Sequence, residues 1–170
     1  MGGVGNNCLL SVDGTDFCVA KSYKKPYYSY KFKKSGFLYK VALCIKTGNI
    51  CWWAGPYLLG IWNDNMIFQD GLVHFLEAGE RCEMDDGYQG SAPLYAKCPG
   101  VIEANLDKAE MQQRVRNRQE TVNKRFKNWA ILSTPYPHQL LEHQTVFGAI
   151  VVLTQLSLAK NPLFQVDYND

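Results

Sequence analysis

Apolar and polar residues alternate along the first part of the chain in the manner of β-strands. In residues 8–20 the alternation puts Val12 and Asp13 on opposite faces of a strand. Two apolar runs follow within residues 37–55, and the turn sequence TGN between them predicts a β-hairpin. A shorter alternating stretch, residues 81–85, predicts one more strand that ends at a carboxylate.

Two further segments have the boundary signals of α-helices. The segment NDNMIFQDGLVHFLEAG begins with Asn63 or Asp64 as a helix N-cap and ends at Gly79. A last helix is expected to begin near Pro137, because proline suits an early helical position, and to run as far as Pro162.

The helix with the clearest period covers residues 106–132. One of its faces carries apolar residues at helical spacing, namely Met111, Val115, Val122 and Phe126. The opposite face is polar and carries Arg116, Glu120, Asn123 and Lys127. In chain order the elements are strand, hairpin, helix, strand, helix and helix, which predicts a mixed α/β fold.

The composition agrees with one globular domain. The chain has 170 residues, 46% of them apolar and 20% charged, which is enough for one core and short for two. No internal repeat or low-complexity linker divides the chain. Residues 1–170 are therefore expected to form a single domain.

Positive charge is concentrated between Asp16 and Asp64. No acidic residue lies between these two, whereas eight lysines do: Lys21, Lys24, Lys25, Lys31, Lys33, Lys34, Lys40 and Lys46. Aromatic residues alternate with these lysines, and phosphates bind cations while unstacked bases bind aromatic faces. The stretch is interpreted either as a nucleic-acid surface, with contacts from Lys31, Lys33 and Lys34, or as a solvated loop and strand edge.

The six cysteines and the apolar runs indicate where the protein resides. No cysteine pair has C-x-x-C spacing, so a zinc knuckle is not expected, although an even number of cysteines permits disulfides. The chain start lacks the basic region of a signal peptide. The most apolar stretch, VFGAIVVLTQLSLA, is shorter than the roughly 20 residues that cross a bilayer. We expect a reduced, intracellular protein with no membrane partner.

Three carboxylates stand out by position: Asp13, Asp85 and Glu120. Acids from separate strands converge only where those strands are neighbours, and converging carboxylates repel one another unless a cation lies between them. Mg²⁺ and Mn²⁺ prefer oxygen ligands, and two such ions about 3.5–4 Å apart would promote attack on a phosphodiester. The basic residues of the same helix would hold phosphates, or would merely keep the helix soluble: Arg116, Lys124 and Lys127.

Each acid also has an ordinary interpretation. An aspartate at a strand end is usually a turn or cap residue. Glu120 lies opposite the apolar stripe of its helix, where a solvated glutamate in a salt bridge is the default.

Several blocks of the chain, in order, resemble the catalytic domain of DDE-type transposases and domesticated nucleases of the PIF/Harbinger group. VDGTDF is similar to the block of the first catalytic aspartate, which corresponds to Asp13. MDDGYQG is similar to the D-x-G-Y block of the second, which selects Asp85 and not Asp86. RVRNRQETVNKRFKNW resembles the third block, with Glu120 as the last metal ligand. TGNICWWAGPYLLGIWNDNMIF resembles the hairpin of the family and the loop after it.

The resemblance implies an RNase H-like fold, with a mixed five-stranded sheet flanked by helices. It also implies Mg²⁺ or Mn²⁺, as two ions held by Asp13, Asp85 and Glu120, and cleavage of double-stranded DNA followed by strand transfer in the nucleus. Transposon ends and target DNA would be the substrates. Two positions depart from the family pattern: Asp16 stands where many relatives carry histidine, and Met84 where a small residue is common.

No helix-turn-helix or other DNA-reading module precedes Asp13, so a catalytic core is expected, with a possible separate DNA-binding partner and a possible homo-oligomer. The alternative function is a domesticated, inactive domain that binds DNA or protein and retains the fold. A nuclease acting on RNA or on hybrids would use the same metal chemistry and stays open at this point.

Overall fold

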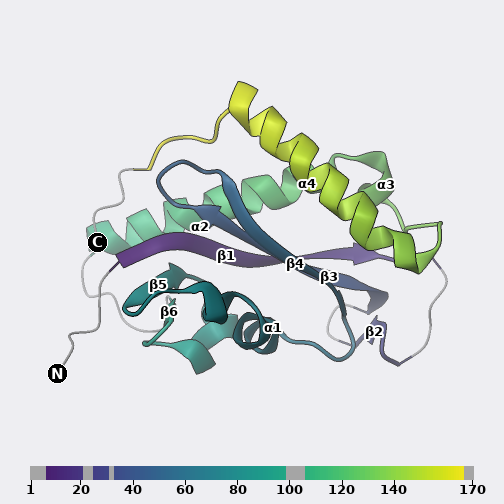
Figure 1. The fold of residues 1–170 in the computed structure, drawn as a ribbon, viewed down its shortest axis with the longest axis horizontal. Helices are drawn as coiled ribbons and strands as arrows, with labels where there is room; N and C mark the ends of the chain where they lie inside the picture. The colour runs from purple at the N-terminus through teal and green to yellow at the C-terminus, as the bar shows by residue number, and fades with distance from the viewer. Residues whose placement is uncertain (1–6, 21–24, 31–32, 99–105, 167–170) are drawn as a thin grey trace.

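The computed structural model describes residues 7–20, 25–30, 33–98 and 106–166 (Figure 1). The strands are β1 (Asn7–Cys18), β2 (Tyr28–Ser29), β3 (Lys34–Cys44), β4 (Ile50–Leu58), β5 (Glu80–Glu83) and β6 (Ala96–Lys97). The α-helices are α1 (Asp64–Asp70), α2 (Leu106–Lys127), α3 (Ala130–Ser133) and α4 (His143–Lys160). Three short 3₁₀ helices are η1 (Leu72–Phe75), η2 (Asp86–Ser91) and η3 (Leu140–Glu142).

The protein is an α/β structure built on one mixed sheet of six strands. The strand order is β2-β3-β1-β5-β6, and β4 also pairs with β3. The pairs that β3 makes with β1, β2 and β4 are antiparallel, whereas β1–β5 and β5–β6 are parallel. The residue pattern predicted four of these strands, and the family resemblance implied five. The two strands that the pattern missed, β2 and β6, have two residues each, too few to leave a readable alternation.

Helices cover both faces of the sheet (Figure 1). Helices α2 and α4 lie on one face, and α1 with η1 and η2 lies on the other. The larger core cluster joins the odd-numbered apolar residues of β3 to α2 and α4, and its most buried members include Tyr39, Val41, Val122, Phe126 and Phe147. The predicted apolar stripe of α2 is thereby confirmed, since Val115, Val122 and Phe126 are buried.

The helix predicted at residues 63–79 is shorter than expected. Asn63 is its N-cap and accepts a hydrogen bond from the Met66 amide, and α1 ends at Asp70 before the chain tightens into η1. The break occurs at Gly71, the residue type least favoured in a helix after proline. A Cβ on Gly71 would lie 3.1 Å from Cζ2 of Trp52, so the glycine also gives that ring room to pack.

The start predicted for the last helix was wrong. Residues 137–139 are not helical, and α4 begins at His143 after η3. Tyr136 is held in an extended conformation by a bridge to Val19. It also precedes Pro137, and the α conformation is disfavoured for a residue before proline. The predicted C-terminal limit is confirmed, because α4 ends at Lys160, two residues before Pro162.

None of the described helices is long and apolar enough to cross a membrane. Among the described residues, no disulfide joins any of the six cysteines.

Candidate acidic site

A pocket of about 110 Å³ lies between the end of β5 and helix α2. It is lined by Ser11, Val12, Asp13, Glu83, Asp85, Arg116, Gln119 and Glu120. The three carboxylates selected from the sequence therefore line one pocket, although they come from three separate elements. They are not drawn into a tight cluster, since no group of three or more His, Cys, Asp or Glu side chains within the described ranges is close enough to hold a metal ion.

Asp13 is accessible because the strand beside it ends early. The parallel pairing of β1 with β5 stops at Ser11 opposite Glu83, whereas the pairing of β1 with β3 continues to Cys18. The backbone amide of Gly14, which has no β5 residue beside it, donates instead to Oδ1 of Asp13 at 2.6 Å. The pocket thus opens at the uncovered edge of β1.

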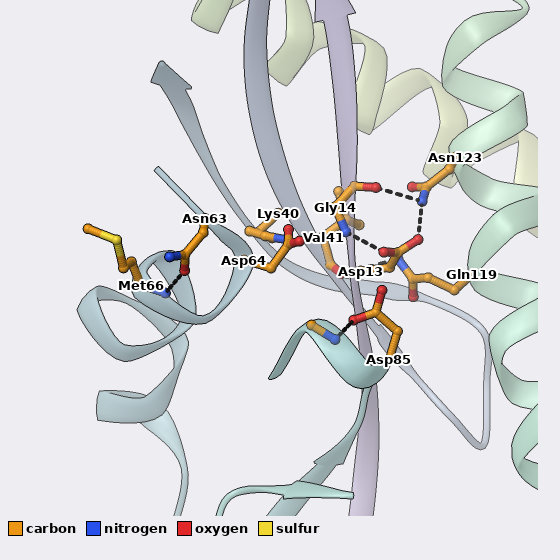
Figure 2. Close-up of polar contacts among 11 residues, drawn as sticks. Asp13, Gly14, Lys40, Val41, Asn63, Asp64, Met66, Asp85, Gln119 and Asn123 are labelled. Carbon is orange, nitrogen blue, oxygen red and sulfur yellow. Dashed lines mark hydrogen bonds and ion pairs between the residues drawn. The ribbon is translucent and has the colours of Figure 1, made fainter. Parts of the chain in front are cut away.

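Helix α2 holds the other oxygen of Asp13. Nδ2 of Asn123 donates to Oδ2 of Asp13 at 2.9 Å (Figure 2). One turn earlier, Gln119 accepts a hydrogen bond from the Ser11 hydroxyl at 3.0 Å and donates to the Val41 carbonyl at 3.1 Å. Polar residues of α2 therefore bind β1 and β3 directly, and Asn123, which was assigned only to the polar face of the helix, is buried against the first carboxylate.

The surroundings of Asp13 favour its protonated form. Burial is the largest cause, and it raises the pKa of Asp13 to about 6. The Gly14 amide and the Lys40 ammonium act in the opposite direction, whereas the carboxylates of Asp85 and Asp64 raise the pKa further. The charges of two other carboxylates and one ammonium therefore affect the pKa of Asp13.

Asp85 is exposed, and its carboxylate points toward Asp13 on β1 (Figure 2). It is the N-cap of η2, and its Oδ1 accepts a hydrogen bond from the Gly87 amide at 2.9 Å. A Cβ on Gly87 would lie 2.9 Å from Oδ1 of Asp85 and 3.4 Å from Oδ2 of Asp64, so these two carboxylates approach the same point. The cap is Asp85 itself, and the neighbouring Asp86 is exposed.

Glu120 lies at the rim of the pocket. Its side chain is 58% exposed, and its Oε2 is 3.8 Å from Nζ of Lys124 one turn along α2. This is the arrangement of an ordinary surface pair on a helix. A fourth carboxylate, Glu83, lines the same pocket but is buried, with Oε1 3.4 Å from Nζ of Lys97.

Lys40 and Asp64 do not line the pocket but form an ion pair near it, which the sequence pattern did not predict. The Lys40 side chain is buried in the middle of β3, and its ammonium makes an ion pair with Oδ1 of Asp64. Burial lowers the pKa of Lys40, and the carboxylates of Asp64, Asp13 and Asp85 oppose that effect. The signal in the sequence was a single charged residue inside the apolar run FLYKVALCI. Asp64, expected to be a helix cap, binds Lys40 while Asn63 caps the helix.

The basic residues selected as nucleic-acid contacts are divided between several places. Lys31 lies outside the described residues, and Lys33 is exposed with a positive φ of 52°. Lys34 and Lys127 both pair with Asp16, the latter at 3.7 Å. Arg116 lines the pocket and donates to Gln113 at 2.9 Å, and Lys124 pairs with Glu120.

Comparisons with known proteins found no matching family model, curated protein or solved structure. The chemistry of the site therefore rests on its own residues. Its donors are oxygen atoms, and burial together with two neighbouring carboxylates disfavours the charged form of Asp13, which a bound cation would offset. Oxygen donors suit Mg²⁺ or Mn²⁺ better than zinc or copper.

Proposed function

We propose that this chain is a metal-dependent nuclease domain that cuts DNA and transfers the cut strand, of the PIF/Harbinger DDE transposase type. The observation that carries the proposal is that Asp13, Asp85 and Glu120 line one pocket although they come from β1, the start of η2 and α2. Carboxylates from three elements that face one opening could together hold the two divalent ions that many phosphodiester-cleaving enzymes use.

The proposal includes an RNase H-like fold. Support comes from the mixed sheet, in which the first hairpin strands are antiparallel and later strands run parallel to β1. Helices on both faces agree with the same expectation (Figure 1). The three carboxylates then lie around the point where β1 extends beyond the end of β5.

Asp13, Asp85 and Glu120 would hold Mg²⁺ or Mn²⁺, as two ions. When bound, these ions would activate the attacking hydroxyl or water and stabilise the leaving oxygen. The chain itself orients the ligands: Asn123 and the Gly14 amide hold the two oxygens of Asp13, and the Gly87 amide holds Asp85. Glu120 already lines the pocket, and to join Asp13 and Asp85 as a ligand it would exchange Lys124 for the metal, at a small cost for an exposed pair.

The substrate of the proposed enzyme is double-stranded DNA, as transposon ends and target, and its place of action is the nucleus. Arg116 in the pocket wall and Lys124 at the rim are placed to contact phosphates without reading bases. A separate DNA-binding protein and a homo-oligomer belong to the same proposal, as the family resemblance implies.

The test is cleavage of a labelled DNA duplex with Mg²⁺ or Mn²⁺ by the purified protein and by Asp85→Asn, Glu120→Gln and Asp86→Asn. We expect metal-dependent nicking that Asp85→Asn abolishes, Glu120→Gln reduces at least about 100-fold, and Asp86→Asn retains, because Asp86 is the matched neighbour outside the site. Equal cleavage by wild type and Asp85→Asn would contradict the assignment.

A second candidate is a binding-only descendant of the same fold. It is favoured by the separation of the carboxylates, since no group of three is tight enough for a metal in the described part of the chain, and Glu120 is already paired. This candidate predicts DNA binding without cleavage by wild type and Asp85→Asn alike, tested with the DNA-binding partner present. It also predicts no rise in melting temperature with Mg²⁺ beyond ionic-strength controls.

A further inference from the structure

Strand β3 carries a buried ammonium beside the acidic pocket. The Lys40 side chain is 1% exposed, and its Nζ forms an ion pair with Asp64 and lies 4.8 Å from the centre of the Tyr88 ring. A Cβ on Gly14, the β1 residue opposite Lys40, would lie 2.7 Å from that Nζ. The absence of a side chain at Gly14 therefore makes room for the ammonium.

A buried lysine in the middle of β3 is unfavourable compared with an apolar residue, which would fit a buried strand more easily. Removing a charge from water is unfavourable unless hydrogen-bonded ion pairs compensate. Lys40 has one close partner, Asp64, whose side chain is 36% exposed, so the pair is open to water on one side only.

Lys40 is also connected electrostatically to the proposed metal ligands. Asp64 connects them in space: its Oδ1 pairs with the ammonium, and its Oδ2 lies beside Gly87, as does Oδ1 of Asp85. The carboxylates of Asp13 and Asp85 also oppose the lowering of the Lys40 pKa by burial, and the ammonium lowers the pKa of Asp13. Figure 2 shows Lys40 with Asp64 on one side of strand β1 and Asp13 with Asn123 on the other, with Asp85 near the open edge. One positive charge, that of Lys40, therefore lies near the carboxylates of Asp13, Asp64 and Asp85.

We propose that Lys40 is the internal counter-ion of the acidic site and weakens its binding of divalent cations, to a degree that Asp64 controls. The inference rests on the proposed metal-dependent function. A divalent ion at Asp13 and Asp85 shares their negative charge with Lys40 and is repelled by it. Asp64 moderates this competition, because it holds the ammonium and offsets its charge.

The test is the dissociation constant for Mn²⁺, measured by calorimetry and by electron paramagnetic resonance at low ionic strength. Lys40→Met should tighten Mn²⁺ binding by about fourfold or more, the repulsion expected between a unit charge and a divalent ion about 10 Å apart in water. Asp64→Asn should weaken binding by a similar factor, because Lys40 keeps its charge and loses its main partner. The double variant should bind within about twofold of wild type.

Two controls separate this effect from general ones. Lys46→Met removes the same charge from an exposed lysine at the β3–β4 turn and should leave Mn²⁺ binding unchanged. Asp85→Asn removes a proposed ligand and should abolish it. If Lys40→Met fails to fold, Asp64→Asn, which retains the lysine, still gives the opposite shift that the inference requires.

The outcomes distinguish the two proposals. Mn²⁺ binding by wild type that neither Lys40→Met nor Asp64→Asn alters would overturn the counter-ion inference and leave the metal site intact. Binding by Lys40→Met alone would support the inference and contradict the proposed activity of the natural chain. No binding by any of these proteins would overturn both.

Discussion

On one face of strand β3, the side chains of Phe37, Tyr39, Val41 and Leu43 join the larger core; on the other, Lys40 stands between Leu38 and Ala42. Both faces are buried, and both contain a titratable group. In the first face, Tyr39 and His143 form a hydrogen bond of 2.8 Å between neutral groups. In the second, Lys40 and Asp64 form an ion pair.

The two faces of β3 therefore have different roles: one stabilises the core, and the other lies beside the proposed metal site. The face of β3 that contacts His143 is filled by aromatic rings, with Tyr39 and Phe147 stacked at 4.0 Å between centroids. Its polar side chains, Tyr39 and His143, are paired by a hydrogen bond without any ionic group. The Lys40 face holds a charge that packing alone does not explain, and that charge lies among carboxylates. Changes on the first face should therefore alter stability, and changes on the second should alter ion binding.

The largest expected effect is on the aromatic face. Phe147 is fully buried and contacts Tyr39, Phe126 and Trp53. Phe147→Ala should lower the free energy of unfolding by about 3–5 kcal/mol, the usual result of removing a buried ring. Urea denaturation measures it, with exposed Leu141→Ala as the control that should change it by less than about 0.5 kcal/mol. A loss below about 1 kcal/mol for Phe147→Ala would refute this account of the core.

The next effect is a pH dependence from His143. Burial lowers the pKa of His143 to about 4, whereas the unfolded imidazole titrates near its ordinary value of 6.5. Between these values the unfolded state binds the proton and the folded state does not, so the stabilising contribution is complete above about pH 6.5 and is lost as the pH falls toward 4. The loss should reach about 3 kcal/mol.

The measurement is the free energy of unfolding against pH for wild type, His143→Gln and the exposed control His138→Gln. Carboxylates contribute in the same range, so the informative quantity is the difference between curves. His143→Gln should flatten the dependence and His138→Gln should keep it. Parallel curves for wild type and His143→Gln would contradict the assignment.

A smaller effect is expected from the ion pair on the opposite face. Asp64→Asn leaves the buried Lys40 ammonium without its main partner and should destabilise the fold by about 2 kcal/mol, reduced from the full value because Asp64 is partly exposed. Lys40→Met should change stability by less than about 1 kcal/mol, since an apolar side chain suits the strand. Thermal and urea denaturation in the absence of metal provide the comparison. Equal losses for both variants would indicate a purely structural pair.

The smallest effect concerns the rim of the pocket. Lys124→Ala removes the partner of Glu120, and both side chains are exposed. It should change the free energy of unfolding by less than about 0.5 kcal/mol. Urea denaturation is sufficient to measure it, beside Thr121→Ala on the same helix. A loss above about 1 kcal/mol would mean that Glu120 is held by Lys124 and is not free to turn toward Asp13 and Asp85.

Elements with a local period were predictable from the sequence. The apolar stripe of α2 and the β3–β4 hairpin follow from spacing alone, and both are present. The family resemblance assigned Asp13 and Asp85 to one site; β1 and β5 are indeed neighbours, and the two aspartates line one pocket.

Features that depend on distant residues were not predictable. The break at Gly71 accommodates Trp52 from β4, and α4 starts late because Tyr136 forms a bridge with Val19, the residue that follows β1. Lys40 lies inside an apolar run, and its burial requires Gly14 on another strand and Asp64 on a helix. The pattern of residues within one segment cannot predict a contact that joins three separate elements.

The most direct test of the proposed site is the position of Mn²⁺ in crystals of the protein soaked with that ion, located by anomalous scattering. The account predicts an anomalous peak bonded to carboxylate oxygens of Asp13 and Asp85, with Glu120 turned toward it, and loss of the peak in Asp85→Asn. A peak only at other residues, or none at concentrations of Mn²⁺ that support cleavage, would contradict the account.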